Sequence, residues 1–175
     1  MDGSYSYISA LRHLQQPDFS VTQPNPFLTP STLLLNLPPF DIILDEHYES
    51  AFEAGMAEQI AEVETITNNP DEATLENTLV AMERSGQMLT RVARVFYSMA
   101  SAHTNDTIEA IRGRIAPKMA AHGDAIGLNP ALFARIKSVY DRRHELHLDS
   151  ESLRLVEETY KDFVRSGALL EGQNK

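Results

Sequence analysis

Apolar residues recur every three or four positions through most of the chain, and no stretch shows the strict alternation typical of a strand. This spacing predicts five amphipathic helices, at about residues 46–67, 75–100, 106–126, 130–140 and 150–166. The fold class is therefore predicted to be all-α. The apolar stripes, which we expect to form the core, are Tyr48, Phe52, Met56, Ile60, Val63, Ile66; Leu75, Leu79, Met82, Leu89, Val92, Phe96, Met99; Ile108, Ile111, Ile115, Met119, Ile126; Leu132, Phe133, Ile136, Val139, Tyr140; and Leu153, Val156, Tyr160, Phe163, Val164.

Residues that start, stop or interrupt helices agree with these boundaries. Ser85-Gly86 is expected to kink or split the second helix, because glycine is unfavourable in a helix interior. Pro117 is expected to bend the third helix or to mark a restart. The expected N-caps are Asp45, Thr74, Asn105 and Asn129, the last helix is expected to follow Asp149-Ser150, and the expected C-cap is Gly167.

The connections between helices are short, which favours antiparallel packing of neighbours. We therefore predict five to six helices in an irregular antiparallel bundle, preceded by an irregular, proline-rich segment. The domain prediction is a flexible or disordered tail (1–24), one helical region (25–170) and a frayed end (171–175). Val80, Met88 and Val95 add apolar surface to the second helix, which indicates either a central position or a surface for an absent partner.

Composition narrows the function classes. The chain has 175 residues, 42% of them hydrophobic, and a formal net charge of −10. This charge argues against a nucleic-acid partner, since such proteins carry clustered Lys and Arg. The apolar runs are far too short to span a bilayer, and no signal-peptide pattern is present, so we expect a cytoplasmic protein without a membrane partner. The absence of cysteine excludes thiol catalysis and cysteine-based zinc sites.

Three groups of residues invite a chemical interpretation. The first, His144-Glu145-Leu146-His147, differs from the zinc-binding pattern His-Glu-x-x-His because its histidines are three and not four residues apart. A solvated helix end is the favoured interpretation of this group over a metal site. The second group, Asp41, Asp45, Glu46 and His47, is more simply explained as a helix cap than as an acid–base cluster. The third group, Tyr5, Tyr7 and His13, lies in the predicted tail. We therefore expect no catalytic, cofactor-binding or metal-binding residue.

Several segments of the chain, taken in order, resemble the N-terminal part of the thimet-oligopeptidase family of zinc metallopeptidases, and most of all the bacterial peptidyl-dipeptidases. Each segment alone is a weak signal, but their order along about residues 25–170 makes the resemblance specific. The segments are Asn25–Leu28, Leu37–Asp41, Thr74–Gly86, Ser101–Asn105, Ile115–His122, Leu128–Ile136 and Tyr160–Ala168.

The resemblance implies a parent enzyme that hydrolyses short peptides with zinc, whose metal-binding motif lies far downstream of anything in this sequence. It also implies that the present helices wall the substrate cleft, with the missing C-terminal catalytic portion as partner and oligopeptides as substrates. We accordingly expect an N-terminal fragment, either truncated or from a fragmentary gene, that is inactive alone. A stand-alone helical module that binds peptides or proteins is the alternative, and a regulator that pairs with a separate catalytic half is a third possibility.

Overall fold

The computed structural model describes residues 24–169, and within this range the chain is helical and contains no strand. The all-α prediction is confirmed. The predicted tail, with Tyr5, Tyr7 and His13, lies outside the described residues apart from Pro24, as does the predicted frayed end. The elements are η2 (Pro26–Leu28), η3 (Leu34–Asn36), α2 (Glu46–Thr67), η4 (Leu75–Val80), α3 (Ala81–Glu83), α4 (Gln87–Ala102), α5 (Asp106–Gly127), α6 (Pro130–Asp141) and α7 (Ser150–Arg165).

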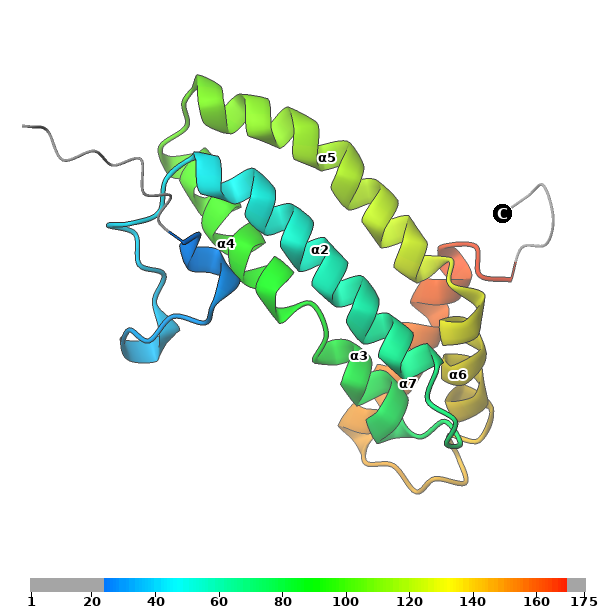
Figure 1. Ribbon diagram of the computed structural model, residues 1–175. Helices are drawn as coiled ribbons and strands as arrows, with labels where there is room; N and C mark the ends of the chain where they lie inside the picture. The colour runs from blue at the N-terminus through cyan, green and yellow to red at the C-terminus, as the bar shows by residue number, and fades with distance from the viewer. Residues whose placement is uncertain (1–23, 170–175) are drawn as a thin grey trace, which may run out of the picture.

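Helix α2 is the central element of the bundle. It packs against α4, α5 and α6. Figure 1 shows α4 running back along α2, while α5 runs beside α2 and curves toward the end where α6 and α7 form an antiparallel pair. No helix within residues 24–169 combines the length and apolar character needed to cross a membrane.

The buried side chains form two clusters, and α2 contributes to both. At 22 residues, α2 is about 33 Å long, which is enough to serve a core at each end. The first cluster joins its N-terminal half to α4, α5 and η2, and the second joins its C-terminal end to η4, α6 and α7. They consist of Phe27, Tyr48, Ala51, Phe52, Leu89, Val92, Val95, Phe96, Ala100, Ile108, Ile111, Ile115 and of Val63, Ile66, Ala73, Leu79, Leu132, Phe133, Ile136, Val139, Val156, Phe163.

The crossing of α2 and α4 is unusually close at Gly55. A Cβ atom at Gly55 would lie 2.9 Å from both the Cα and the backbone nitrogen of Leu89. Met88 and Val95, two of the additional apolar residues noted on the second predicted helix, are buried. The burial of these two side chains accounts for part of the additional apolar surface, and Val80 is half-buried.

The second predicted helix is split, as Ser85-Gly86 indicated. Its first part begins at a capping box, in which Asn77 N–H donates to Thr74 Oγ1 and Thr74 N–H donates to Asn77 Oδ1. Element η4 is then wound loosely, with Ala81 N–H donating to the carbonyl oxygen of Glu76 five residues earlier. Gly86 adopts φ of 68°, a left-handed conformation that ends the first part before α4 begins.

Most predicted caps are confirmed. Asn105 and Asn129 each accept backbone N–H groups of the helix that follows, and Asp149 does the same for α7. At the end of α7, Gly167 has φ of 99°, and Ala168 N–H donates to the Phe163 carbonyl oxygen at 3.0 Å, which completes a Schellman motif.

One expectation is corrected, and the structure decides between two alternatives for another. Asp45 is not an N-cap by its side chain, because its backbone is already helical and its carboxylate accepts no bond from the first turn. His47 Nδ1 instead accepts the Leu44 N–H at 3.0 Å. At Pro117 there is no restart, because α5 continues through it and curves without a break (Figure 1).

The segment before α2 is irregular, as predicted, but it is anchored to the bundle. Phe27 is buried, and its ring lies 5.4 Å from that of Tyr48. Arg91 Nη2 on α4 donates to the Phe27 carbonyl oxygen at 2.8 Å. The Asn25 amide donates to the His47 carbonyl oxygen at 2.7 Å, so η2 is held by both α2 and α4.

Candidate functional site

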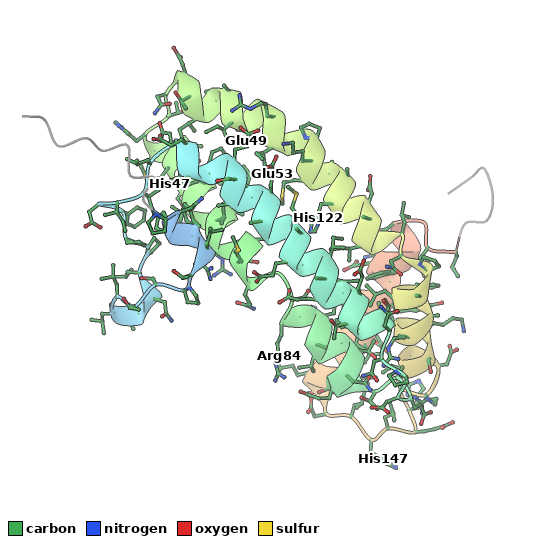
Figure 2. The ribbon with its side chains drawn as sticks, viewed as in Figure 1. His47, Glu49, Glu53, Arg84, His122 and His147 are labelled. Atoms are coloured by element: carbon green, nitrogen blue, oxygen red, sulfur yellow. The ribbon has the colours of Figure 1, made fainter. Side chains whose placement is uncertain are left out.

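The His144-Glu145-Leu146-His147 group lies in the turn between α6 and α7 and not on a helix. His144, Glu145 and His147 are exposed, and His147 has φ of 48°. Figure 2 places His147 at the far end of the molecule from His47, with His122 between them. Within residues 24–169 no group of three or more His, Cys, Asp or Glu side chains is arranged to hold a metal ion, so the described residues do not fit a zinc site.

Two residues of the group at the start of α2, Asp45 and His47, have structural partners. The Asp45 carboxylate accepts a hydrogen bond from Asn105 Nδ2 at 2.8 Å, which joins the start of α2 to the start of α5. His47 Nδ1 is occupied by the Leu44 N–H, so its lone pair is not free to accept a proton from a substrate. This geometry favours a tethering role for Asp45 and His47 over acid–base chemistry.

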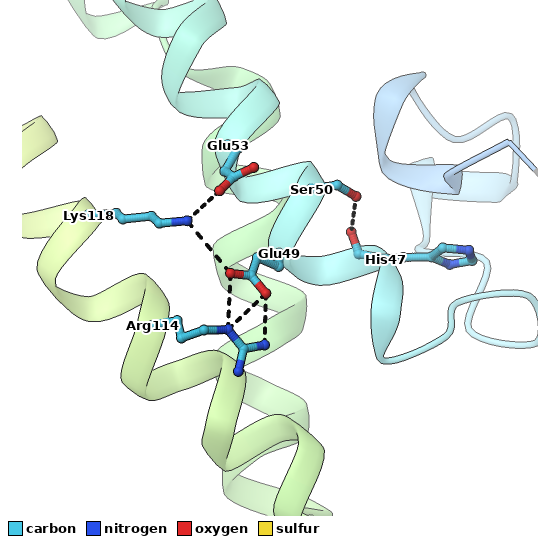
Figure 3. Close-up of polar contacts among 6 residues, drawn as sticks. All are labelled: His47, Glu49, Ser50, Glu53, Arg114 and Lys118. Atoms are coloured by element: carbon cyan, nitrogen blue, oxygen red, sulfur yellow. Dashed lines mark hydrogen bonds and ion pairs between the residues drawn. The ribbon is translucent and has the colours of Figure 1, made fainter.

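A salt-bridge network joins α2 to α5 (Figure 3). The Arg114 guanidinium donates twice to Glu49 through Nε and once through Nη2, at 2.8 to 3.1 Å. Lys118 binds Glu53 and lies 3.6 Å from Glu49. The hydrogen bond from Arg114 holds the pKa of Glu49 below its usual value. Because both carboxylates are neutralised by cations, the network fixes α5 along α2 and offers no free base.

A second polar network lies where the two cores meet. His122 Nε2 on α5 lies 2.7 Å from Gln59 Oε1 on α2, and Gln59 Nε2 lies 3.4 Å from Ser85 Oγ at the helix break. Gly86 N–H donates to Glu62 Oε2 at 2.7 Å. Burial lowers the pKa of His122, which favours the neutral ring.

This network resembles a catalytic relay only in its residue types. The Ser85 hydroxyl donates to the Met82 carbonyl oxygen at 2.7 Å, and a glutamine separates the serine from the histidine. A nucleophile needs an adjacent base to take its proton, and Ser85 has none among these contacts. Sequence reasoning missed the network, although Ser85-Gly86 marked one end of it.

An open groove runs along the outer face of α4. It is shallow and largely open to solvent, and it is lined by Ala93, Arg94, Tyr97, Ser98 and Ser101. The partly exposed Tyr97 ring, a guanidinium and two hydroxyls are groups that bind peptides in an orientation-dependent way. None of these residues was singled out from the sequence, because a single exposed tyrosine on a helix carries no pattern.

The sequence segments, taken in their order along the chain, indicate a class: the chain resembles the N-terminal part of a bacterial peptidyl-dipeptidase. No family model matches the chain. The chain is 44% identical over 155 residues, or 89% of its length, to the dipeptidyl carboxypeptidase of Escherichia coli (strain K12). It is 44% identical over 151 residues, or 86% of its length, to the dipeptidyl carboxypeptidase of Salmonella typhimurium.

These comparisons confirm the resemblance that the sequence segments indicated. The chain spans less than a quarter of the length of these relatives, 23% of one and 22% of the other. The activity of a whole dipeptidyl carboxypeptidase is therefore a property of a much longer polypeptide than the one described here.

Proposed function

We propose that this chain is the helical N-terminal region of a peptidase of the dipeptidyl carboxypeptidase type, and that residues 25–170 form a wall of its substrate cleft. The observation that carries the proposal is the 44% identity over 155 residues, together with coverage of only 23% of the relative. In this proposal the parent enzyme releases dipeptides from the carboxyl ends of oligopeptides. The rest of the polypeptide would hold the zinc ion, which would supply the Lewis-acid chemistry for peptide hydrolysis.

The role of the present residues is to restrict access. A wall that admits only short, extended peptides must keep its shape, and the bundle has the features this requires. Two cores share α2, and the Glu49–Arg114 salt bridge holds α5 in place. The groove on α4, with Arg94 and Tyr97, is the surface of this wall that we expect to contact peptide.

The test is a chimera in which this chain replaces the matching segment of the E. coli dipeptidyl carboxypeptidase. We expect the chimera to remove dipeptides from a short oligopeptide, and the chain alone to show no chelator-sensitive cleavage, even with added zinc. A well-folded chimera without activity would refute the proposal. Zinc-dependent cleavage by the isolated chain would also refute it, because the catalytic groups would then lie within these 175 residues.

A stand-alone peptide-binding module is the second candidate, and the α4 groove is the observation that favours it. It predicts that the isolated chain binds a labelled pentapeptide and that Tyr97→Ser weakens the binding at least tenfold. A continuing reading frame with a His-Glu-x-x-His motif beyond Lys175 would favour the fragment instead. If the chain is a regulator of a separate catalytic half, mixing the two should restore activity.

A further inference from the structure

Exposed apolar side chains are concentrated in the segment that precedes α2. Of the ten large apolar side chains that are exposed within residues 24–169, eight lie in this one segment. Leu34 and Leu35 at its tip are 81% and 84% exposed. An apolar patch of this kind on a folded chain is typical of a surface that binds another protein or a membrane. We call these eight residues the leucine ledge: Leu28, Leu33, Leu34, Leu35, Leu37, Phe40, Ile42 and Leu44.

The shape of the leucine ledge is fixed by local hydrogen bonds. Ser31 Oγ donates to the Leu37 carbonyl oxygen at 2.6 Å and accepts the Leu33 N–H at 3.2 Å. Leu35 and Asn36 both adopt left-handed backbone, with φ of 58° and 55°. This conformation is unfavourable for leucine, so the loop keeps a strained backbone that presents two leucines to solvent.

The charged side chains within the segment itself are all acidic, although Arg91 of α4 reaches the start of the segment at Phe27. No lysine or arginine occurs anywhere between Arg12 and Arg84. Asp41, Asp45 and Glu46 follow or interrupt the ledge residues along the chain. A partner surface that complements the ledge would therefore be apolar at its centre and would carry lysine or arginine at its edge.

We propose that the leucine ledge docks on such an apolar, basic-edged surface in the catalytic remainder of the parent polypeptide. The inference rests on the proposed function, and it names the contact through which that function is assembled. Relatives extend over more than four times the length of the matched segment, so most of the polypeptide that could cover the ledge is absent from this chain. An anionic membrane is disfavoured as the occupant, because the acidic residues beside the ledge would be repelled by it.

The test uses the chimera with the E. coli enzyme and the double substitution Leu34→Asp with Leu35→Asn. Asparagine accepts left-handed backbone more readily than leucine, so the isolated chain should unfold at the same temperature as the wild type or higher. In the chimera, the same pair of substitutions should accelerate tryptic digestion at least tenfold and lower the unfolding temperature. Leu169→Asp is the matched control, an apolar-to-acidic change at a side chain that is 53% exposed and lies outside the ledge, and should leave digestion within twofold of the wild type.

Several outcomes would overturn the inference. Equal digestion of the wild-type and ledge-variant chimeras would do so even if the chimera cleaves peptides, in which case the proposed function stands. A chimera that fails to fold with native leucines would count against docking, whereas one that folds and is inactive counts against the proposed function.

In the isolated chain, dimers lost on substitution would assign the ledge to a second copy, and binding to anionic vesicles would assign it to a membrane. A large rise in hydrophobic-dye binding on deletion of residues 2–23 would show that the chain covers its own ledge.

Discussion

Gly55→Ala is the sharpest test of how the two central helices pack. Alanine is favoured over glycine in a helix by about 1 kcal/mol, so propensity alone predicts a more stable protein. The structure predicts the opposite. The new Cβ would meet the Leu89 backbone at 2.9 Å, which is well inside ordinary contact distance, and a backbone atom cannot rotate away as a side chain can.

The magnitude follows from this geometry. Helices α2 and α4 must separate by about 0.5 Å or more, and inserting a methyl into a packed core costs about 1–3 kcal/mol. A backbone neighbour places Gly55→Ala at the upper end of that range. After the gain in propensity, the free energy of unfolding should fall by about 1–2 kcal/mol, which lowers Tm by roughly 2–8 °C for a chain of this size.

The assay is urea unfolding followed by far-ultraviolet circular dichroism, with Gly113→Ala and Gly123→Ala as controls. Both control glycines lie in α5, and a Cβ at either position meets no atom within 4 Å. Each control should raise the free energy of unfolding by up to about 1 kcal/mol. If Gly55→Ala matched or exceeded the stability of the wild type while the controls behaved as expected, the close crossing of α2 and α4 would be refuted.

Three further predictions concern the polar contacts. Arg135→Met removes the donors to the Asn69 and Asp71 carbonyl oxygens and to Asn77 Oδ1. The free energy of unfolding should therefore fall by about 2–4 kcal/mol. The control Arg165→Ala, at an exposed ion pair, should lower it by less than about 0.5 kcal/mol. Gly86→Ala should lower the free energy of unfolding, measured in urea, by about 1–2 kcal/mol. Gly86 has φ of 68°, and a Cβ atom there would lie 2.5 Å from the Gln59 side chain. If Gly86→Asn keeps the wild-type stability while Gly86→Ala does not, the loss is due to the backbone conformation alone. The lowered pKa of Glu49 means that its bond to Arg114 stabilises the fold above the usual value of 4.5 and is lost as the pH falls through the lowered pKa. Arg114→Gln should therefore raise the pKa of Glu49 in an NMR titration and move acid unfolding to higher pH, and an unchanged Glu49 titration would contradict the salt bridge.

The helices could be predicted from the sequence because their signals are local. The bounds of α2 agree with the pattern of apolar residues and with Asn68-Asn69-Pro70 after it. The N-caps at Thr74, Asn105 and Asn129 depend on residues only two or three positions apart, which periodicity and residue type encode directly. Asp45 does not cap α2, because its carboxylate instead accepts a hydrogen bond from Asn105 at the start of α5. That contact joins residues 60 positions apart, so the local sequence does not indicate it.

The polar networks could not be predicted in the same way. Glu49 and Arg114 are 65 positions apart, and their contact depends on how α5 is rotated against α2. The leucine ledge was equally hidden, because a run such as Leu33–Leu35 has the composition of a buried segment. Its exposure follows from the left-handed turn at Leu35 and Asn36, and neither residue is a glycine that would have signalled such a turn.

The sharing of α2 between two cores has a consequence for synthesis on the ribosome. Every residue of the first core lies between Phe27 and Ile115, whereas the second core is complete only with Val156 and Phe163. A chain made from its N-terminus can therefore close the first core while the far end of α2 still exposes Val63 and Ile66. That half-covered helix is the surface to which nascent-chain chaperones would bind until α6, which packs against α2, and then α7 complete the second core.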